Sequence, residues 1–387
     1  MQKKLIALAV AGLASTAAFA QSNVTIYGVV DAGYLASSGD RGNAGGDANR
    51  NGINSGLLSG SRIGFRGEEG LGNGLKAVFT LEYGLDVDGN FGVGTSGTGS
   101  SGLTARQQFI GLSSATVGTV ALGRQYAPAF YASGRNDPFM SSTGIGSLAR
   151  LTSGAGNTIS GTGVVSDNGG SRWDNAVTYT SPTWSGFSVR AAYSFGERNG
   201  GANGVSSGDN GKFGLGANYA NGGLNLDVVF QHTKEAQLAA VAGNDNVTEW
   251  YVGGSYDFKV VKLFASYQDK DDKSETAANG DWSNKIWQVG ATVPVFGNGK
   301  IHVGYTKLSW DQSSFDDTKA WNLMYSHALS KRTTLYTGYT RFDNGDRPAG
   351  IPATGHVRSG HNAFSNHGIG VAGEKNGTFA AGINHAF

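Results

Sequence analysis

The sequence predicts an all-β chain that closes into a 16-stranded antiparallel transmembrane β-barrel, with a long third extracellular loop folded into the lumen. Three observations lead to this prediction. The chain has 63 glycines, only 6 prolines and many aromatic residues, a composition typical of strands joined by tight turns. Segments of about ten residues alternate apolar and polar side chains, as membrane-crossing strands do. The connections between these segments are short and long in turn, which sorts them to the two ends of a barrel.

The first 20 residues are interpreted as a cleaved signal peptide. Lys3 and Lys4 precede an apolar run that ends in the small-residue cleavage site Ala18-Phe19-Ala20. A membrane anchor is the weaker interpretation, because the apolar run is short and interrupted by Gly, Ser and Thr. Cleavage leaves residues 21–387 as one barrel domain and, by removing two lysines, takes the formal charge from +1 to −1. This balance gives no support for a nucleic-acid partner.

A water-soluble fold is the simplest alternative, since no later segment has the ~18 consecutive apolar residues of a membrane helix. The chain is only 39% hydrophobic, which is low for a conventional core, and it has no cysteine for disulfides. A closed barrel needs neither a large hydrophobic core nor disulfides, because its strands are hydrogen-bonded along both edges. The number of alternating segments decides between the two alternatives.

Sixteen segments alternate like strands, and single-chain bacterial barrels contain an even number. In chain order they are Val24–Leu35, Ser61–Gly67, Leu75–Val87, Thr104–Ser113, Gly118–Tyr126, Trp173–Thr180, Phe187–Phe195, Lys212–Ala220, Leu224–Thr233, Glu249–Phe258, Val261–Asp269, Asn284–Val295, Lys300–Trp310, Lys319–Ala328, Thr333–Phe342 and Gly377–Phe387.

The connections between these segments alternate in length. The short ones are Glu68–Gly74, Ser114–Val117, Ser181–Gly186, Asn221–Gly223, Lys259–Val260, Phe296–Gly299 and Leu329–Arg332. The long ones are Ala36–Gly60, Asp88–Leu103, Ala127–Arg172, Gly196–Gly211, Lys234–Thr248, Lys270–Ser283, Asp311–Thr318 and Asp343–Asn376. A membrane barrel has short periplasmic turns and longer extracellular loops, whereas a soluble β-sandwich has no reason to sort its connections.

The third long connection, residues 127–172, opens with APAFYASGRNDPF and continues in Gly, Ser and Thr, so it cannot build a core of its own. Compact domains rarely contain a structureless connection of this length unless it is functional. We therefore expect residues 127–172 to fold back into the lumen and to constrict the pore.

Side chains alternate between the faces of a strand, so one parity meets lipid and the other faces the lumen. In Leu75–Val87 the outward parity is Leu75, Ala77, Phe79, Leu81 and Tyr83. The inward parity includes Lys76, Thr80 and Glu82, and in Phe187–Phe195 it includes Arg190. An inward face this polar is not a packed core, and sixteen strands leave room for an aqueous channel.

Several stretches, in this order, resemble the trimeric general porins of Gram-negative outer membranes, in their β-proteobacterial branch. They are VTIYGVVDAGY, SRIGFRGEEGLGNGLKAVFTLEY, RQQFIGL followed by GTVALGRQYAPAF, RWDNAVTYTSP and the terminal GINHAF. The resemblance covers the whole mature chain, although the long loops match poorly.

The resemblance implies a homotrimer in the outer membrane that lets small hydrophilic solutes and ions diffuse passively, without a cofactor. It also implies contact with outer-membrane lipid and lipopolysaccharide. A terminal phenylalanine after alternating apolar residues resembles the signal read by the barrel-assembly machinery, which makes Phe387 a candidate assembly residue.

The same resemblance implies a cluster of arginines at the constriction, for which the candidates are Arg62, Arg106, Arg124 and Arg172. Parity directs Arg62 inward if Ile63 and Phe65 face out, and Arg106 inward if Phe109 faces lipid.

Arg172 is directed inward if Trp173 heads the outward set of its strand. Arg124 shares its parity with the apolar Val120 and Leu122, so it rests on the resemblance alone and needs a β-bulge to reach the lumen.

Glu82 and Asp137 are the acidic candidates, expected to oppose the arginines and to create a transverse field. The alternative for each charge is simple solvation, since many surface charges contribute little. With both acids the local balance is still positive, which predicts a modest anion preference.

Other function classes find less support. Gly368–Gly373 matches GxGxxG but no strand leads into it, and the charged run Asp269–Lys273 lacks the glycine and glutamate of a calcium loop. None of the seven histidines has HExxH spacing, so no metal site is expected and a barrel enzyme is a remote alternative. A substrate-selective channel is the nearer alternative, and a surface adhesin is a third.

Overall fold

The computed structural model describes residues 23–39, 49–89, 104–142, 144–148, 171–196, 211–234, 246–271, 283–311, 316–343, 345 and 375–387. The expected signal peptide, the GxGxxG match and much of the long connections lie outside the described residues. No helix in these ranges is long and apolar enough to cross a membrane.

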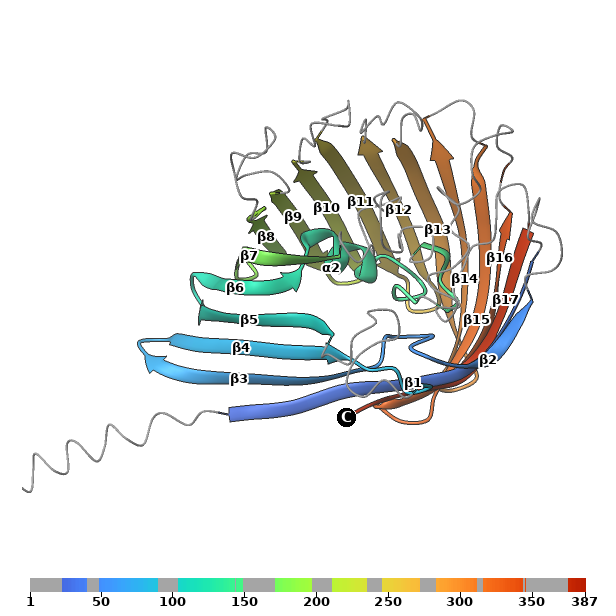
Figure 1. Ribbon diagram of the computed structural model, residues 1–387, viewed down its shortest axis with the longest axis horizontal. Coiled ribbons are helices and arrows are strands. Elements are labelled where there is room, and N and C mark those ends of the chain that lie inside the picture. Colours follow the sequence, from blue (N-terminus) through green and yellow to red (C-terminus); the bar gives the residue numbers. More distant parts are fainter. Residues whose placement is uncertain are drawn as a thin grey trace, which may run out of the picture.

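In the described residues, a single sheet of 17 strands, each antiparallel to its neighbours, makes up the fold (Figure 1). The strands are β1 (Asn23–Gly39), β2 (Arg50–Ser55), β3 (Arg62–Gly72), β4 (Leu75–Gly84), β5 (Ala105–Ser114), β6 (Gly118–Tyr126), β7 (Arg172–Thr180), β8 (Phe187–Ser194), β9 (Lys212–Asn221), β10 (Leu224–Thr233), β11 (Val247–Asp257), β12 (Lys262–Asp271), β13 (Asn284–Val295), β14 (Gly299–Trp310), β15 (Thr318–Ala328), β16 (Thr333–Asp343) and β17 (Lys375–Ala386). Helix α2 (Pro128–Arg135) follows β6.

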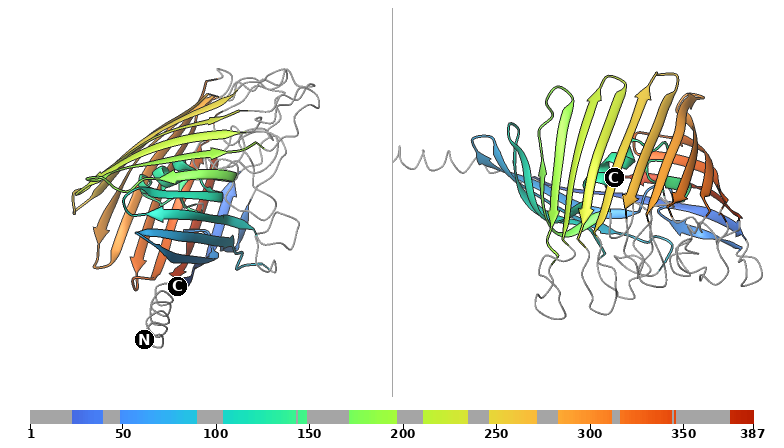
Figure 2. Two further views of the ribbon diagram at one scale, coloured as in Figure 1. Left: turned by 90° about the vertical axis from the view of Figure 1, so that its left-hand side faces the viewer. Right: turned by 90° about the horizontal axis from the view of Figure 1, so that it is seen from above.

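The sheet closes into a barrel because β1 pairs with β17 along one edge and with β2 and β3 along the other (Figure 2). At the seam the backbone N–H of Phe387 donates to the carbonyl of Gly28 and the N–H of Gly28 donates to the carbonyl of Phe387, both over 3.1 Å. A Cβ at Gly28 would lie 2.4 Å from the ring of Phe387, so this approach requires glycine. The last residue of the chain therefore helps to close the barrel.

Among the described residues, β2 is the one strand that the alternation pattern misses, since it lies in the connection 36–60 that was expected to be a loop. Helix α2 was not expected either, because the connection 127–172 was interpreted as structureless. Its sequence, RNGINS, contains a single large apolar residue and so gives no alternation to detect. β2 pairs with residues 32–37 of β1, and β3 pairs with residues 23–29 of the same edge. The two segments are thus halves of one barrel position, interrupted by residues 56–61, and the predicted 16-stranded barrel is confirmed.

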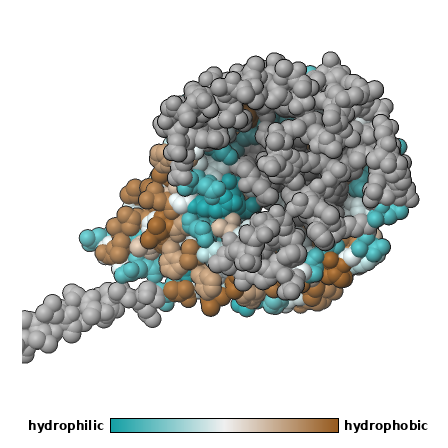
Figure 3. Space-filling view, viewed as in Figure 1, coloured by the Kyte–Doolittle hydropathy of each residue, from teal (hydrophilic) through white to brown (hydrophobic). Residues whose placement is uncertain are grey.

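The two faces of the sheet differ as parity predicts. On β10, for example, Leu226 and Val228 are exposed, while the alternating residues Asp227, Val229 and Gln231 are buried. Figure 3 shows apolar residues on the outer wall over the lower strands of the view and hydrophilic residues in the recess beside them. An apolar exterior and a polar interior suit a barrel whose solvent outside is lipid.

The segment after β6 packs on the polar face of the sheet. Helix α2 contacts β8 to β11, where Pro128 lies against Gly214 and Gly216 of β9. Further along, Pro138 lies against Gly290 and Phe139 against Gly304, so glycines on β13 and β14 provide the space for this segment. Figure 1 shows α2 within the curve of the sheet.

Candidate functional site

Three of the residues proposed from the sequence meet at one carboxylate. Glu82 on β4 is 4% exposed and accepts a hydrogen bond from Nε of Arg106 over 3.0 Å, and Nε of Arg62 lies 3.8 Å from its other oxygen. The phenols of Tyr27 and Tyr126 each donate to this carboxylate over 3.0 Å. Two guanidinium groups and two hydroxyls supply the hydrogen bonds that the carboxylate can accept. Because two positive charges surround one negative charge, the group has a net positive charge.

The position of Glu82 differs from the expectation. An acid opposite the arginines would have produced a transverse field, but the contacts show Glu82 beside Arg62 and Arg106 on neighbouring strands. Strand pairing explains this arrangement, because β4 lies between β3 and β5 and places its inward side chains between theirs. The carboxylate of Glu82 therefore holds the guanidinium groups of Arg62 and Arg106 in place.

Arg106 reaches this site through a β-bulge. Phe109 was assumed to face lipid, but Ile110 and Leu112 are the exposed residues of β5, so its parity is the reverse. The register shifts between Glu82 and Tyr83, so that Arg106 has no partner on β4 and the alternation changes phase there. The inward direction of Arg106 was expected for the wrong reason.

A second bulge affects Arg172. Trp173 was expected to face lipid, yet it is 3% exposed and packs with Ala127, Ala176 and Ala192. Asn175 has a positive φ of 50° and the β6–β7 register shifts beside it, which reverses the parity of the residues before it. Arg172 belongs to the site through its stacking, with Cζ 5.0 Å from the ring centre of Tyr126.

Arg124 and Asp137 lie apart from this cluster. Arg124 forms an ion pair with the exposed Asp174 over 2.5 Å and pairs across strands with Gln108, which is on the outward parity of β5. The bulge required for Arg124 is present, but it does not bring this side chain to Glu82.

The carboxylate of Asp137 accepts hydrogen bonds from the backbone of Phe139 and Ser141 and from Gln288 of β13. Burial raises its pKa. Its described contacts are with β13 and its own turn, so Asp137 attaches the segment to β13.

The sequence reasoning missed an aromatic row that connects the arginines. Tyr126 stacks on Phe130 with ring centres 4.0 Å apart, and Tyr131 meets both rings edge-on. Arg190 of β8 lies over Tyr131 with Cζ 4.0 Å from the ring centre. Burial raises the pKa of the Tyr131 phenol above its usual range. The i, i+4 spacing of Tyr126 and Phe130 across the start of α2 was the only available signal.

The charge of this cluster is strongly unbalanced. Arg62, Arg106, Arg172 and Arg190 contribute four guanidinium groups, against the single carboxylate of Glu82. The described residues contain no group of three or more His, Cys, Asp or Glu side chains that could hold a metal ion. Such a basic surface attracts anions.

The chain belongs to the Gram-negative porin family, whose model matches residues 7–347. It is 34% identical to outer membrane porin protein 32 of Delftia acidovorans over the full length of both chains. It is 31% identical to an outer membrane porin protein of Bordetella pertussis, over 87% of this chain and 93% of the relative. Family membership identifies the barrel as an outer-membrane diffusion channel.

Among solved structures, an anion-selective porin from Comamonas acidovorans superposes with a TM-score of 0.75 at 28% identity, covering 95% of this chain and all of that chain. The trimer form of OmpT from Vibrio cholerae superposes with a TM-score of 0.58 at 15% identity, covering 95% of this chain and 99% of that chain, and shares the fold.

Proposed function

We propose that the protein is a general diffusion channel of the outer membrane with a preference for small hydrophilic anions. The observation that carries the anion preference is the four-to-one balance of arginines over the single carboxylate Glu82. Basic side chains that line a pore lower the energy of a passing anion and raise that of a cation. Transport of this kind is passive, so it needs no cofactor and no energy source.

Residues 127–172 are proposed to form the constriction. In their described part, the N–H of Ala129 donates to Gln231 of β10 over 3.1 Å, and Ser147 shares a hydrogen bond of 2.6 Å with Thr306 of β14. A segment attached to β10 and β14 on the polar face takes up part of the cross-section of the barrel. It also brings Phe130 and Tyr131 to the arginines.

We further propose a homotrimer whose contacts use the outer face of β1, β5 and β6. This wall exposes aliphatic side chains, of which Ile110 is 62% and Leu122 is 54% exposed. The opposite wall instead has aromatic pairs on its outward parity between neighbouring strands, such as Phe230 of β10 with Trp250 of β11 and Trp287 of β13 with Tyr305 of β14. Aromatic side chains favour the interface with lipid, which supports placing the aromatic wall against lipid and the aliphatic wall against the partner subunits.

The channel is tested by adding the purified protein to a planar lipid bilayer and recording the current. Stepwise increases in current are expected, and excision of residues within 127–172 should raise the size of each step. A protein that inserts without conducting would contradict the proposal, and an unchanged step after excision would contradict the constriction.

The trimer is tested by electrophoresis of unheated protein in mild detergent. The wild type should migrate as a trimer, and Ile110→Glu should weaken it because a carboxylate would be buried in the interface. The matched variant Val252→Glu, at a 51% exposed position of the aromatic wall, should leave the trimer intact. Equal loss in both variants would contradict the assignment of the walls.

A further inference from the structure

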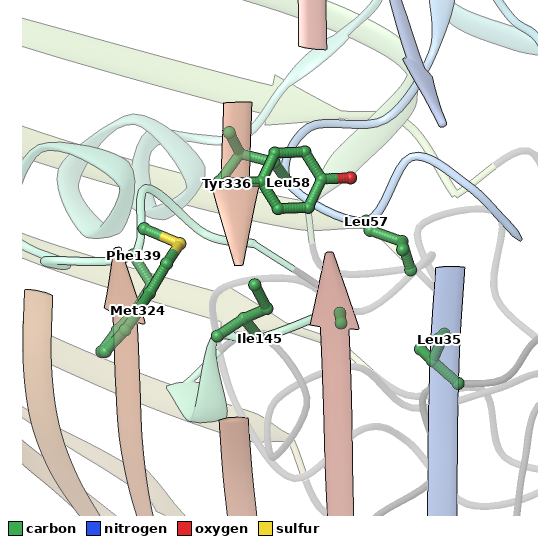
Figure 4. Packing of buried hydrophobic residues seen from close by; sticks show 8 residues of the cluster. Leu35, Leu57, Leu58, Phe139, Ile145, Met324 and Tyr336 are labelled. Carbon is green, nitrogen blue, oxygen red and sulfur yellow. The ribbon is translucent and has the colours of Figure 1, made fainter. Parts of the chain in front are cut away.

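The interruption between β2 and β3 turns inward and meets the far part of the segment 127–148. Leu57 is fully buried and Leu58 is 6% exposed. Both leucines belong to one buried cluster with Phe139 and Ile145 of that segment and with Leu35, Met324 and Tyr336 from the barrel wall (Figure 4). A short stretch of the wall and the loop thus share one apolar cluster.

Backbone contacts join the two parts more specifically. The carbonyl of Leu57 accepts a hydrogen bond from Oγ of Ser142 over 2.7 Å and one from the N–H of Gly144 over 2.8 Å. A Cβ on Gly144 would lie 2.7 Å from that carbonyl oxygen and 2.8 Å from Cβ of Leu57. The loop can therefore approach the interruption this closely only with glycine at position 144.

The interruption is held in turn by Asp31 of β1, which is fully buried. One carboxylate oxygen accepts from the phenol of Tyr336 over 2.8 Å and the N–H of Leu58 over 3.4 Å. The other oxygen accepts from Nδ2 of Asn384 over 2.8 Å and the N–H of Ser59 over 3.1 Å. Four donors from β16, β17 and the interruption converge on one side chain.

We propose that Asp31 is a positioning residue for the channel: it fixes residues 56–61 as an inward seat, and that seat holds residues 142 and 144–148 of the loop in one position. This inference rests on the proposed constriction and names the part of the wall that keeps it from moving. A steady constriction gives one conductance level, whereas a released loop samples several positions.

A carboxylate suits this place because it only accepts hydrogen bonds, and all four of its partners here are donors. Asparagine has nearly the same shape but offers one accepting oxygen and one donating amide. In one orientation the amide of Asp31→Asn would point its hydrogens at the N–H of Ser59, and in the other at the N–H of Leu58. A backbone N–H can only donate, so at least one donor would be left without a partner in either orientation. The substitution thus tests the chemistry of the seat without changing its size.

The experiment compares Asp31→Asn with Asp257→Asn, the same change at a partly exposed turn position, in bilayer recordings of the full chain. If Asp31 fixes the seat, Asp31→Asn should show frequent transitions between current levels, and Asp257→Asn should show a single steady level. Because the chain has no cysteine, Ser147→Cys can report on the loop through its reaction with a water-soluble thiol reagent. Adding Asp31→Asn should speed this reaction about tenfold, the effect of losing one to two buried hydrogen bonds.

A second variant acts from the loop side and leaves the barrel wall unchanged. Gly144→Ala pushes the loop away from Leu57, while Gly52→Ala on β2 has open space around its new Cβ. Gly144→Ala should reproduce the current transitions and the faster labelling, and Gly52→Ala should reproduce neither. This pair keeps the test decisive if Asp31→Asn does not fold.

The two proposals fail in different ways. A wild type without channel activity would overturn the proposed function itself. A wild type that conducts steadily, with Gly144→Ala equally steady and Ser147→Cys labelled at an unchanged rate, would overturn the seat alone.

Discussion

The two sides of the inner wall are used differently. Strands β3, β5, β7 and β8 carry Arg62, Arg106, Arg172 and Arg190, which remain partly exposed. Strands β10 to β16 carry amides and hydroxyls that are buried under the segment 127–148. These are Gln231, Gln288, Thr306, Asn322 and Thr340, and each contacts that segment.

This difference follows from the cost of burial. A neutral amide or hydroxyl can be covered if it keeps a hydrogen-bond partner, and the loop supplies one for each. A guanidinium group costs far more to cover unless a carboxylate accompanies it. Most of the loop contacts therefore lie on neutral side chains, and where the loop meets charged groups each has a partner: Phe130 and Tyr131 stack on Arg172 and Arg190, and Arg135 pairs with Asp227. Four predictions test this division, in order of expected effect.

Removing Arg62 and Arg106 together should change selectivity most, because it also leaves Glu82 unbalanced. One unit charge about 8 Å from an ion in water contributes roughly 0.5 kcal/mol, so each arginine changes the anion-to-cation ratio about fivefold and the pair roughly twentyfold or more. Reversal potentials of the double alanine variant check this at low salt. Lys259→Ala, at an exposed turn, is the control and should have no comparable effect. A double variant with wild-type selectivity would remove these arginines from the ion path.

Arg190→Ala should lower the anion preference about fivefold by the same estimate, since one charge is lost and no carboxylate is released. The ring of Tyr131 would lose its stacked guanidinium but keep its place on α2. The same recordings test this, and a drop larger than that of the double variant would contradict the order of effects.

Asp227→Asn should act in the opposite direction. Asp227 of β10 pairs with Arg135 of α2 and accepts hydrogen bonds from Asn136 and Asn225. Neutralising it leaves the charge of Arg135 uncompensated and should raise the anion preference up to about fivefold. A fall in the anion preference would show that Arg135 does not face the ion path.

Asp137→Asn should have the smallest effect. Burial raises the pKa of Asp137, so its contribution to stability is present at low pH and is lost as the pH rises through the raised value. Asparagine imitates the protonated form and keeps an oxygen that can accept from Phe139 and Gln288, so only the hydrogen bond from Ser141 is lost. The variant should therefore keep its conductance and lose this part of the pH dependence of thermal stability. This pH dependence is measured from melting curves of both proteins between pH 4, near the usual pKa of an aspartate, and about pH 8. Equal pH dependence in wild type and variant would contradict the assignment.

Alternation and loop lengths were enough to predict the barrel, its strand number and the inward position of Arg62 and Glu82. They were not enough where a strand contains an extra residue. The bulges at Arg106 and Asn175 reverse parity without any apolar or polar mark in the sequence, so Phe109 and Trp173 were placed on the wrong face. β2 was missed because its side chains do not alternate.

The contacts of the loop could not be predicted for a different reason. Asp137 meets Gln288 across 151 residues, and Leu57 meets Ser142 across 85. Such pairs depend on how far the loop crosses the barrel, which no local pattern encodes. Charge type alone suggested that Asp137 opposes the arginines, and only the geometry shows that it is held by β13.

The central claim is that the partly exposed arginines of the basic wall determine which ions pass. The most direct measurement is the reversal potential of the wild-type channel across a salt gradient, repeated as the mean salt concentration rises. The arrangement of the arginines predicts an anion-selective potential at low salt that declines as the Debye length falls from about 10 Å at 0.1 M to about 3 Å at 1 M. A cation-selective potential, or an anion preference that does not change with salt, would contradict it.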